Sequence, residues 1–169
     1  SESRNIPGRV ARYAWGRDYH AVLRERLDSL SGWISHQWRE KYPRDDVLFR
    51  VCVDSAPIDE RAFAVRAGLG FIGKNTLLLD LDHGSWFLIG ILLTSLSLSP
   101  DQPMQDPAAS CGSCRHCLNA CPTSAFDDAY RLDPRKCISY LTIEQKDEIP
   151  DTLATKMGDR VLGCDICQE

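Results

Sequence analysis

The chain has 169 residues, 43% of them hydrophobic and 26% charged, with a formal net charge of −4. This length and composition are typical of a globular protein with one domain of ordinary size or two small ones. The net charge gives no overall attraction to nucleic acid or to an anionic membrane, so contact with RNA would need a local basic patch. The longest apolar run, residues 86–93, is far shorter than the roughly 20 residues needed to cross a bilayer. We therefore expect a cytoplasmic protein that makes no membrane contact.

The first predicted element is an amphipathic helix that begins at Asp18. Large apolar residues recur at helical spacing over residues 23–38, with charged residues between them. The run at residues 47–53 is apolar and rich in β-branched residues, which predicts a buried strand. Cys52 lies inside this run, so we interpret it as a buried, small hydrophobic residue and not as a metal ligand.

A second helix and a hairpin are predicted after that strand. Ser55 is a candidate N-cap, Pro57 suits the first turn, and Gly68 ends the apolar periodicity. The glycine-rich string GLGFIGKN comes next. Two apolar runs follow it, residues 76–81 and 85–94, and the Asp-His-Gly between them predicts a β-hairpin.

A proline-containing segment divides the chain into two parts. Residues 97–110 contain three prolines and show no periodicity, which is typical of a linker. We therefore predict an α+β domain over residues 1–98 and a cysteine-rich domain over residues 99–169. In the second domain, the Asp-Pro pair at 133–134 predicts the start of a helix that carries Cys137.

Seven of the eight cysteines lie in the second domain and carry the most specific signal. The string CGSCRHCLNACP, residues 111–122, has the C-x2-C-x2-C-x3-C-P spacing of bacterial ferredoxins. There the first three cysteines bind one [4Fe–4S] cluster and the fourth binds a second. A zinc ribbon would show two separate C-x2-C pairs, and a disulfide scaffold is typical of secreted chains, so iron–sulfur ligation is favoured over both.

Ferredoxin logic divides the seven cysteines between two clusters. The first cluster would take Cys111, Cys114 and Cys117. The second would take Cys121, Cys137, Cys164 and Cys167. Two clusters need eight thiolates, so we expect the eighth ligand beyond Glu169, where a further x3-Cys-Pro would complete the second run. The serine at position 1 also suggests part of a longer protein. Two such clusters conduct electrons but do not define a substrate.

The α+β domain contains one acidic residue of particular interest. Asp54 follows the predicted strand and precedes the second helix, a position that suits an N-cap as well as a catalytic acid. The string GLGFIGKN follows a helix and not a strand, which gives little support to a dinucleotide-binding fingerprint.

Five further strings, in order around CGSCRHCLNACP, carry a family resemblance: YAWGRDYH, VDSAPIDER, RAGLGFIGKN, CISYLTIE and GCDICQ. Together they closely resemble the epoxyqueuosine reductase family over nearly the whole chain. The resemblance implies a nitroreductase-like α+β domain that binds cobalamin, followed by a two-cluster ferredoxin-like domain. It also implies reduction of epoxyqueuosine to queuosine in tRNA. Family members have a segment before YAWGRDYH and usually helical repeats after the ferredoxin part.

The resemblance assigns Asp54 as the proton donor. Reductive opening of an epoxide leaves an alkoxide that needs a proton. A carboxyl group is ordinarily ionised at neutral pH, so a donor needs desolvation, for which the apolar residues 51–53 are a source. The resemblance also places further residues around the cofactor or the RNA. The predicted cofactor-binding residues are Tyr13, Arg17, His20, Asp54, Gly73, Lys74, Asn75 and Ser139.

Each of these residues also has an ordinary structural explanation. His20 could cap or pack a helix, Lys74 could be solvated in a turn, and Ser139 could lie on a helical core face. The pattern Asp-x-His-x-x-Gly is absent from the YAWGRDYH string, so base-off cobalamin without a histidine ligand is expected.

The predicted enzyme is a monomer that takes electrons from an external donor of the flavodoxin or ferredoxin type. The electrons would pass through both clusters to cobalamin, and the substrate would be a tRNA anticodon loop carrying epoxyqueuosine. Two alternatives stay open. A reductive dehalogenase would share the chemistry, and a ferredoxin-type carrier with a docking domain would share the clusters but bind no cobalamin.

Overall fold

A computed structural model describes residues 7–106 and 110–169. We call residues 7–106 the α+β half and residues 110–169 the cysteine half. The α+β half contains β1 (Arg9–Val10), the 3₁₀ helix η1 (Arg12–Ala14), α1 (Tyr19–Lys41), β2 (Phe49–Cys52), α2 (Glu60–Arg66), β3 (Phe71–Ile72), β4 (Leu78–Leu79) and β5 (Ile91–Thr94). The cysteine half contains α3 (His116–Ala120), β6 (Phe126–Asp128), β7 (Arg131–Leu132), the 3₁₀ helix η2 (Pro134–Lys136), α4 (Ile138–Ile143), α5 (Asp151–Met157) and β8 (Arg160–Leu162).

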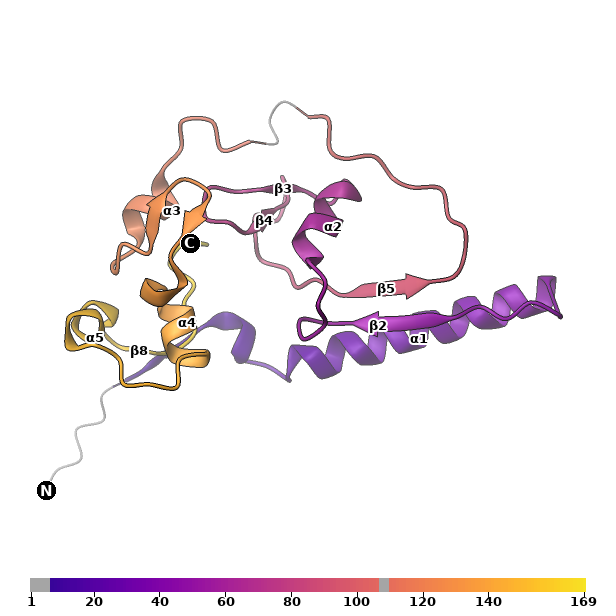
Figure 1. Ribbon diagram of the computed structural model, residues 1–169, viewed down its shortest axis with the longest axis horizontal. Helices are drawn as coiled ribbons and strands as arrows, with labels where there is room; N and C mark the ends of the chain where they lie inside the picture. Colours follow the sequence, from indigo (N-terminus) through magenta and orange to yellow (C-terminus); the bar gives the residue numbers. More distant parts are fainter. Residues whose placement is uncertain (1–6, 107–109) are drawn as a thin grey trace, which may run out of the picture.

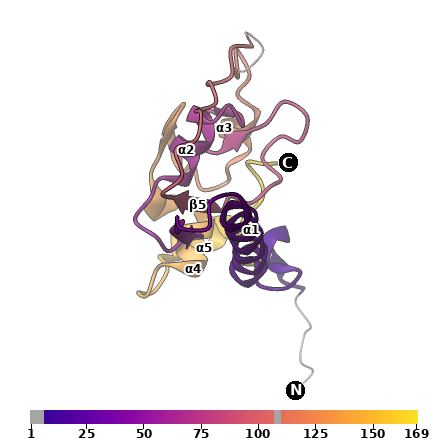
Figure 2. The ribbon, with the colours of Figure 1, turned by 90° about the vertical axis from the view of Figure 1, so that its right-hand side faces the viewer.

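The longest element is α1, which confirms the first predicted helix. The side chain of Asp18 accepts a hydrogen bond from the backbone N–H of His20 and so caps the helix. Arg39 and Lys41 lie in the last turn, where positive charge suits the helix dipole. No residue of α1 is buried, although the helix lies along one side of β2 and β5 (Figures 1 and 2).

The predicted strand around Cys52 is also confirmed. β2 pairs antiparallel with β5, from Phe49 opposite Thr94 to Cys52 opposite Ile91. Cys52 is 1% exposed and Val53 is fully buried, so this thiol is part of the core. Both views place the strand pair between α1 and α2 (Figures 1 and 2).

The predicted hairpin over residues 76–94 is wrong. β4 pairs with β3, and β5 pairs with β2, so the two apolar runs have different partners. Only an isolated bridge joins Asp80 to Gly84. There the Asp80 carboxylate accepts hydrogen bonds from the backbone N–H groups of Asp82 and His83, which closes a local turn but does not start a ladder.

The second helix begins later than its sequence suggests. Asp59, and not Ser55, caps it by accepting a hydrogen bond from the N–H of Ala62 at 3.0 Å. The hydroxyl of Ser55 instead donates to the carbonyl of Val53. Serine and aspartate are about equally good N-caps, so the hydrogen bond that Asp59 makes decides that α2 starts at Glu60.

The cysteine half has a small core of its own. Ile138, Leu141 and Met157 are buried together, and Cys164 packs against them. The helix predicted from the Asp-Pro pair is split, because η2 ends at Lys136 and α4 begins at Ile138. Cys137 lies between the two pieces in an extended conformation. Its thiol therefore projects from a break between helices.

The start of the described chain pairs with its end. β1 and β8 form a parallel pair, with Arg9 opposite Arg160 and Val10 opposite Leu162 (Figure 1). Gly163 follows β8 with φ +65°, and its backbone lies against Ala11 and Tyr13. The α+β half thus reaches onto the cysteine half through its first strand. Among the described residues, no helix is both long and apolar enough to cross a membrane.

Gly163→Ala should destabilise the protein more than an alanine at another left-handed glycine. The new Cβ would lie 2.6 Å from the Cβ of Ala11. The left-handed backbone costs about 1 kcal/mol for alanine, and overpacking adds about 2 kcal/mol. Gly84→Ala is the matched control, since Gly84 has φ +63° but nothing within 4 Å of its added Cβ. Urea denaturation of anaerobically purified protein measures both, and equal losses would contradict a packing role for Gly163.

Candidate active site and cluster-binding cysteines

A cavity of about 890 Å³ lies between the two halves. Its walls from the α+β half include Arg12, Tyr13, Tyr19, His20, Asp54, Leu77, Ser85, Trp86, Phe87 and Leu88. Its walls from the cysteine half are Ser139, Ile143, Glu144, Asp165 and Gln168. These walls combine seven apolar or aromatic residues with eight polar or charged ones, and the volume lies at the upper end of the usual range for ligand sites. The residues present therefore fit a large cofactor such as cobalamin.

Asp54 enters this cavity from the end of β2. Its φ is +56°, a left-handed conformation that is uncommon for a residue with a side chain. The backbone N–H of Ser55 donates to the carbonyl of Val53 at 2.6 Å, so the chain turns tightly around Asp54. The side chain of Asp54 is 66% exposed. The desolvation expected from residues 51–53 is therefore not provided by the described residues.

His20 connects Asp54 to the cap of α1. Its Nδ1 lies 2.8 Å from a carboxylate oxygen of Asp18, and its Nε2 lies 3.2 Å from a carboxylate oxygen of Asp54. These contacts, that with Asp18 first and that with Asp54 second, raise the pKa of His20 above its ordinary value. A protonated imidazole donates to both carboxylates at once. The geometry thus keeps a proton beside Asp54 at a higher pH than an isolated histidine would.

Two tyrosines form the aromatic side of the same group. The ring of Tyr19 stacks on His20 with centroids 4.0 Å apart, and Tyr13 meets Tyr19 edge to face at 6.0 Å. Burial, and then the charge of Asp54, raise the pKa of Tyr19 to about 12. Burial and the charge of Asp165 also raise the pKa of Tyr13. Both phenols are therefore neutral hydrogen-bond donors at physiological pH.

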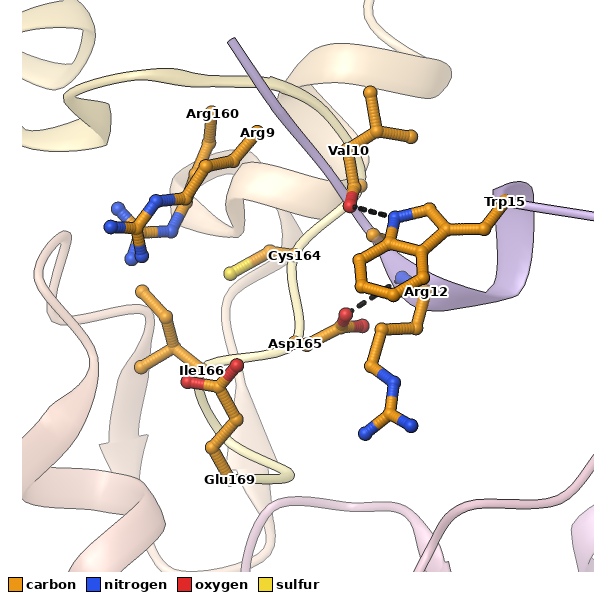
Figure 3. Close-up of a pocket in the computed structure, with 11 residues that line it drawn as sticks. Arg9, Val10, Arg12, Trp15, Arg160, Cys164, Asp165, Ile166 and Glu169 are labelled. Carbon is orange, nitrogen blue, oxygen red and sulfur yellow. Dashed lines mark hydrogen bonds between the residues drawn. The ribbon is translucent and has the colours of Figure 1, made fainter. Parts of the chain in front are cut away.

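Arg12 lies where the cavity approaches the cysteines. Its guanidinium is 4.5 Å from the ring centroid of Trp86 and 5.8 Å from that of Trp15, and both contacts are cation–π interactions. Its backbone N–H donates to the carboxylate of Asp165 at 2.7 Å, as Figure 3 shows. Asp165 directly follows Cys164, so this bond joins the wall of the cavity to a predicted cluster ligand.

The predicted cluster ligands line two separate cavities. One, of about 420 Å³, is lined by Cys111, Cys114, Cys117 and Cys167. The other, of about 40 Å³, is lined by Cys121, Cys137, Cys164 and Cys167. Cys167 lines both cavities, whereas ferredoxin spacing assigns it to the second group alone. In residues 7–106 and 110–169, no three or more His, Cys, Asp or Glu side chains are close enough to hold a single metal ion.

Burial raises the pKa of several of these thiols. For Cys167 it does so to about 12, with smaller contributions from Cys164 and other cysteines. The pKa values of Cys117 and Cys164 are raised for the same main reason. Such thiols are neutral by themselves and become thiolates only where a metal centre supplies positive charge. The cysteine half therefore has thiol donors at both cavities.

The loop between β3 and β4, residues 73–77, contacts the cysteines directly. The backbone N–H of Lys74 donates to the sulfur of Cys111 at 3.3 Å. Asn75 is only 5% exposed, and its side-chain amide donates to the carbonyl of Cys167 at 2.8 Å. We call residues 73–77 the β3–β4 loop. Its hydrogen bonds hold Cys111 and Cys167 against the α+β half.

The structure brings together half of the predicted cofactor-binding residues. Tyr13, His20, Asp54 and Ser139 line the 890 Å³ cavity. Lys74 and Asn75 line the 420 Å³ cysteine cavity instead, and Gly73 immediately precedes them. Arg17 forms an exposed ion pair with Glu25 at 2.6 Å and lines neither cavity.

Sequence reasoning missed several wall residues. Tyr19 lies inside the string YAWGRDYH, next to residues that were selected, so the same signal could have identified it. Glu144 and Gln168 end the strings CISYLTIE and GCDICQ, so the same signal could have identified them too. Trp86 belongs to none of the quoted strings, and only the folded chain brings it to the cavity.

Comparison with known proteins agrees with these features. Residues 110–169 match the family described as a 4Fe-4S double cluster binding domain. Residues 1–55 match the family described as Epoxyqueuosine reductase QueG, DUF1730. An epoxyqueuosine reductase from Synechocystis sp. is 44% identical over 163 residues, which cover 96% of this chain and 53% of that protein. The chain belongs to the epoxyqueuosine reductase family. Its cysteine half is a domain that binds 4Fe–4S clusters.

Solved structures of the family share this fold. An epoxyqueuosine reductase with an epoxyqueuosine-modified tRNA-Tyr stem loop matches at a TM-score of 0.83 and 39% identity, over 95% of this chain and 40% of that one. A structure of the Bacillus subtilis epoxyqueuosine reductase has its catalytic aspartate loop swung out of the active site. It matches at a TM-score of 0.81 and 39% identity, over 95% of this chain and 40% of that one. The chain thus spans about half the length of the family members it matches, or somewhat less.

Asp18→Asn should lower the pKa of His20 toward its ordinary value of about 6.5, because the largest cause of its upward shift is removed. Asparagine can still cap α1, so the helix should persist. NMR titration of the His20 ring measures the shift. In the unsubstituted protein, protonated His20 stabilises the fold below about pH 6.5, and this contribution is lost as the pH rises through the raised value. Asp28→Asn, on the same helix, is the control, and an unchanged pKa in Asp18→Asn would contradict the assignment.

Proposed function

We propose that this protein reduces epoxyqueuosine in tRNA to queuosine, with cobalamin bound in the 890 Å³ cavity. The observation that carries the proposal is that this single cavity contains the Asp54–His20 pair on one wall and residues adjoining predicted cluster ligands on the other. When bound, cobalamin supplies a strongly reducing cobalt centre able to open an epoxide. The overall change consumes two electrons and two protons, and it converts the epoxide to an alkene and water.

The chain's own contribution is to deliver protons at one place. The oxygen released from the epoxide needs a proton, and the carboxyl of Asp54 is the proposed donor. His20 would restore that proton through the 3.2 Å contact between its Nε2 and the Asp54 carboxylate. Asp18 on the other side of the imidazole stabilises its charged form. A protonated histidine in contact with the Asp54 carboxylate supplies the proton that this step needs.

The aromatic and apolar walls would limit access of water. Trp86 and Phe87 belong to one wall, and Ile143 belongs to the opposite one. Burial, and then the charge of Asp54, raise the pKa of Tyr19, so its hydroxyl stays neutral and can orient a substrate or cofactor oxygen as a donor. Excluding water strengthens each of these polar contacts.

The domain arrangement proposed for this function has two parts. Residues 1–98 would form part of the cobalamin-binding, nitroreductase-like domain, and residues 99–169 the two-cluster ferredoxin-like domain. An external flavodoxin or ferredoxin would supply electrons one at a time. The seven cysteines of the cysteine half would ligate the clusters, with the eighth thiolate supplied from outside residues 1–169.

The proposed substrate is the anticodon loop of a tRNA, bound by a monomer in the cytoplasm. A family member has been solved with an epoxyqueuosine-modified stem loop, and this chain is 39% identical to it. Single-stranded loops present splayed bases that proteins can enclose in a pocket, which suits a cavity open to solvent at the Asp54 side chain.

Anaerobic incubation of the complete protein with cobalamin, reductant and an epoxyqueuosine stem loop tests the proposal. Mass spectrometry of the digested RNA should show a modified nucleoside lighter by one oxygen atom. A haloarene dehalogenated at a comparable rate, with no change in the RNA, would identify a reductive dehalogenase instead. A protein that holds iron but never binds cobalamin would be an electron carrier.

Asp54→Asn should lower kcat at least about 100-fold, the usual contribution of a positioned acid, while iron and cobalamin contents stay unchanged. His20→Gln should also slow turnover and should remove the loss of rate at high pH that titration of His20 produces. Asp82→Asn, an exposed acid in the turn before Gly84, is the control. A normal rate in Asp54→Asn with cofactors in place would remove Asp54 from the mechanism.

A further inference from the structure

Lys74 makes four contacts with the cysteine half, although its neighbours in sequence belong to the other half. Its ammonium group donates to the carbonyls of Gly112 and Cys114 at 2.6 and 2.8 Å. Its backbone N–H donates to the sulfur of Cys111 at 3.3 Å, and its carbonyl accepts from the N–H of Tyr130 at 3.0 Å. Charge and hydrogen bonding from one residue therefore act on the first turns of the cysteine run.

The surroundings of the two cysteine cavities differ in charge. Lys74 is the only lysine or arginine among the described residues that line the 420 Å³ cavity, where Glu169 is the only acid. Among the described residues, the wall of the 40 Å³ cavity has no charged side chain and is apolar beside its cysteines. Arg160 acts on Cys164 from outside this wall, but it is paired with Asp159 at 3.9 Å. A centre in the first cavity thus lies near a cation, and a centre in the second lies in an apolar environment.

We propose that Lys74 raises the reduction potential of the cluster bound by Cys111, Cys114 and Cys117 above that of the cluster bound by the other cysteines. Adding one electron makes a cluster more negative by one charge. A nearby ammonium stabilises that extra charge by Coulomb attraction. Each cavity also has a cysteine sulfur that accepts a backbone N–H at 3.3 Å, Cys111 from Lys74 and Cys121 from Ala125, so the ammonium is what distinguishes the two. An apolar environment does the opposite, because added charge is costly in a low dielectric.

The difference in reduction potential decides which cluster receives the first electron. The proposed external donor adds one electron, which occupies the cluster of higher potential, and no proton is required. The cluster beside Lys74 would then be the first to be reduced, and the apolar cluster would be reduced only at a lower potential. Lys74 is a positioning residue in this account and contacts no substrate.

Three substitutions separate the charge of Lys74 from its hydrogen bonds. In Lys74→Gln a neutral amide can still donate to the Gly112 and Cys114 carbonyls, but the positive charge is lost. Lys74→Arg retains the charge. Lys156→Gln removes the same charge from an exposed position on α5 of the cysteine half and is the control.

The test is an anaerobic redox titration of the complete protein, followed by electron paramagnetic resonance, with iron content measured for each variant. We expect Lys74→Gln to shift one of the two midpoint potentials downward and to leave the other in place. Lys74→Arg and Lys156→Gln should resemble the unsubstituted protein. Unchanged midpoints in Lys74→Gln would overturn the proposal. Loss of iron in both Lys74→Gln and Lys74→Arg would also overturn it, because Lys74 would then act only as a structural clamp.

This inference rests on the double-cluster part of the proposed function and not on its substrate. The titration reads the clusters alone, so its outcome does not depend on RNA or cobalamin. A downward shift in Lys74→Gln together with no reduction of epoxyqueuosine RNA would leave the inference standing and reject the proposed substrate.

Discussion

Hydrogen bonds from the β3–β4 loop to the cysteine half are the contact on which the arrangement of this protein depends. Lys74 and Asn75 hold two separate pieces of the cysteine half, one at the start of the cysteine run and one at Cys167. Because Asn75 is buried, breaking its bond would leave an unsatisfied polar group in the interior. These bonds keep the predicted ligands of both cavities, and the wall residues beside them, in place against the α+β half.

The β1–β8 pair is a second attachment between the α+β half and the cysteine half. It fixes the segment that leads into Arg12 and Tyr13, and from there into the cap of α1. Asp18 has two tasks as a result, since one carboxylate caps the helix and also holds His20 against Asp54. A helix start, a strand end and a metal-binding half therefore converge on one place. Such convergence at the edges of rigid elements is typical of sites that do chemistry.

Local signals in the sequence predicted local structure well. The cap at Asp18 and the burial of Cys52 depend on neighbours a few residues away, and both are found. The hairpin failed because strand pairing is decided by distant partners: the run ending at Thr94 pairs with β2, some 40 residues earlier. The contacts of Lys74 with the cysteine half could not be predicted for the same reason, because its loop meets the cysteines only in the folded chain. Asp59 caps α2 in place of Ser55, although both residues lie close to the start of the helix.

Metal analysis of the complete protein, purified without oxygen in the presence of cobalamin, tests the central claim most directly. We propose that one cavity holds a corrin beside a pair of clusters. This arrangement predicts about eight irons and one cobalt per chain, with the visible absorbance of both cofactors. A single zinc, or clusters without any retained cobalt, would contradict it.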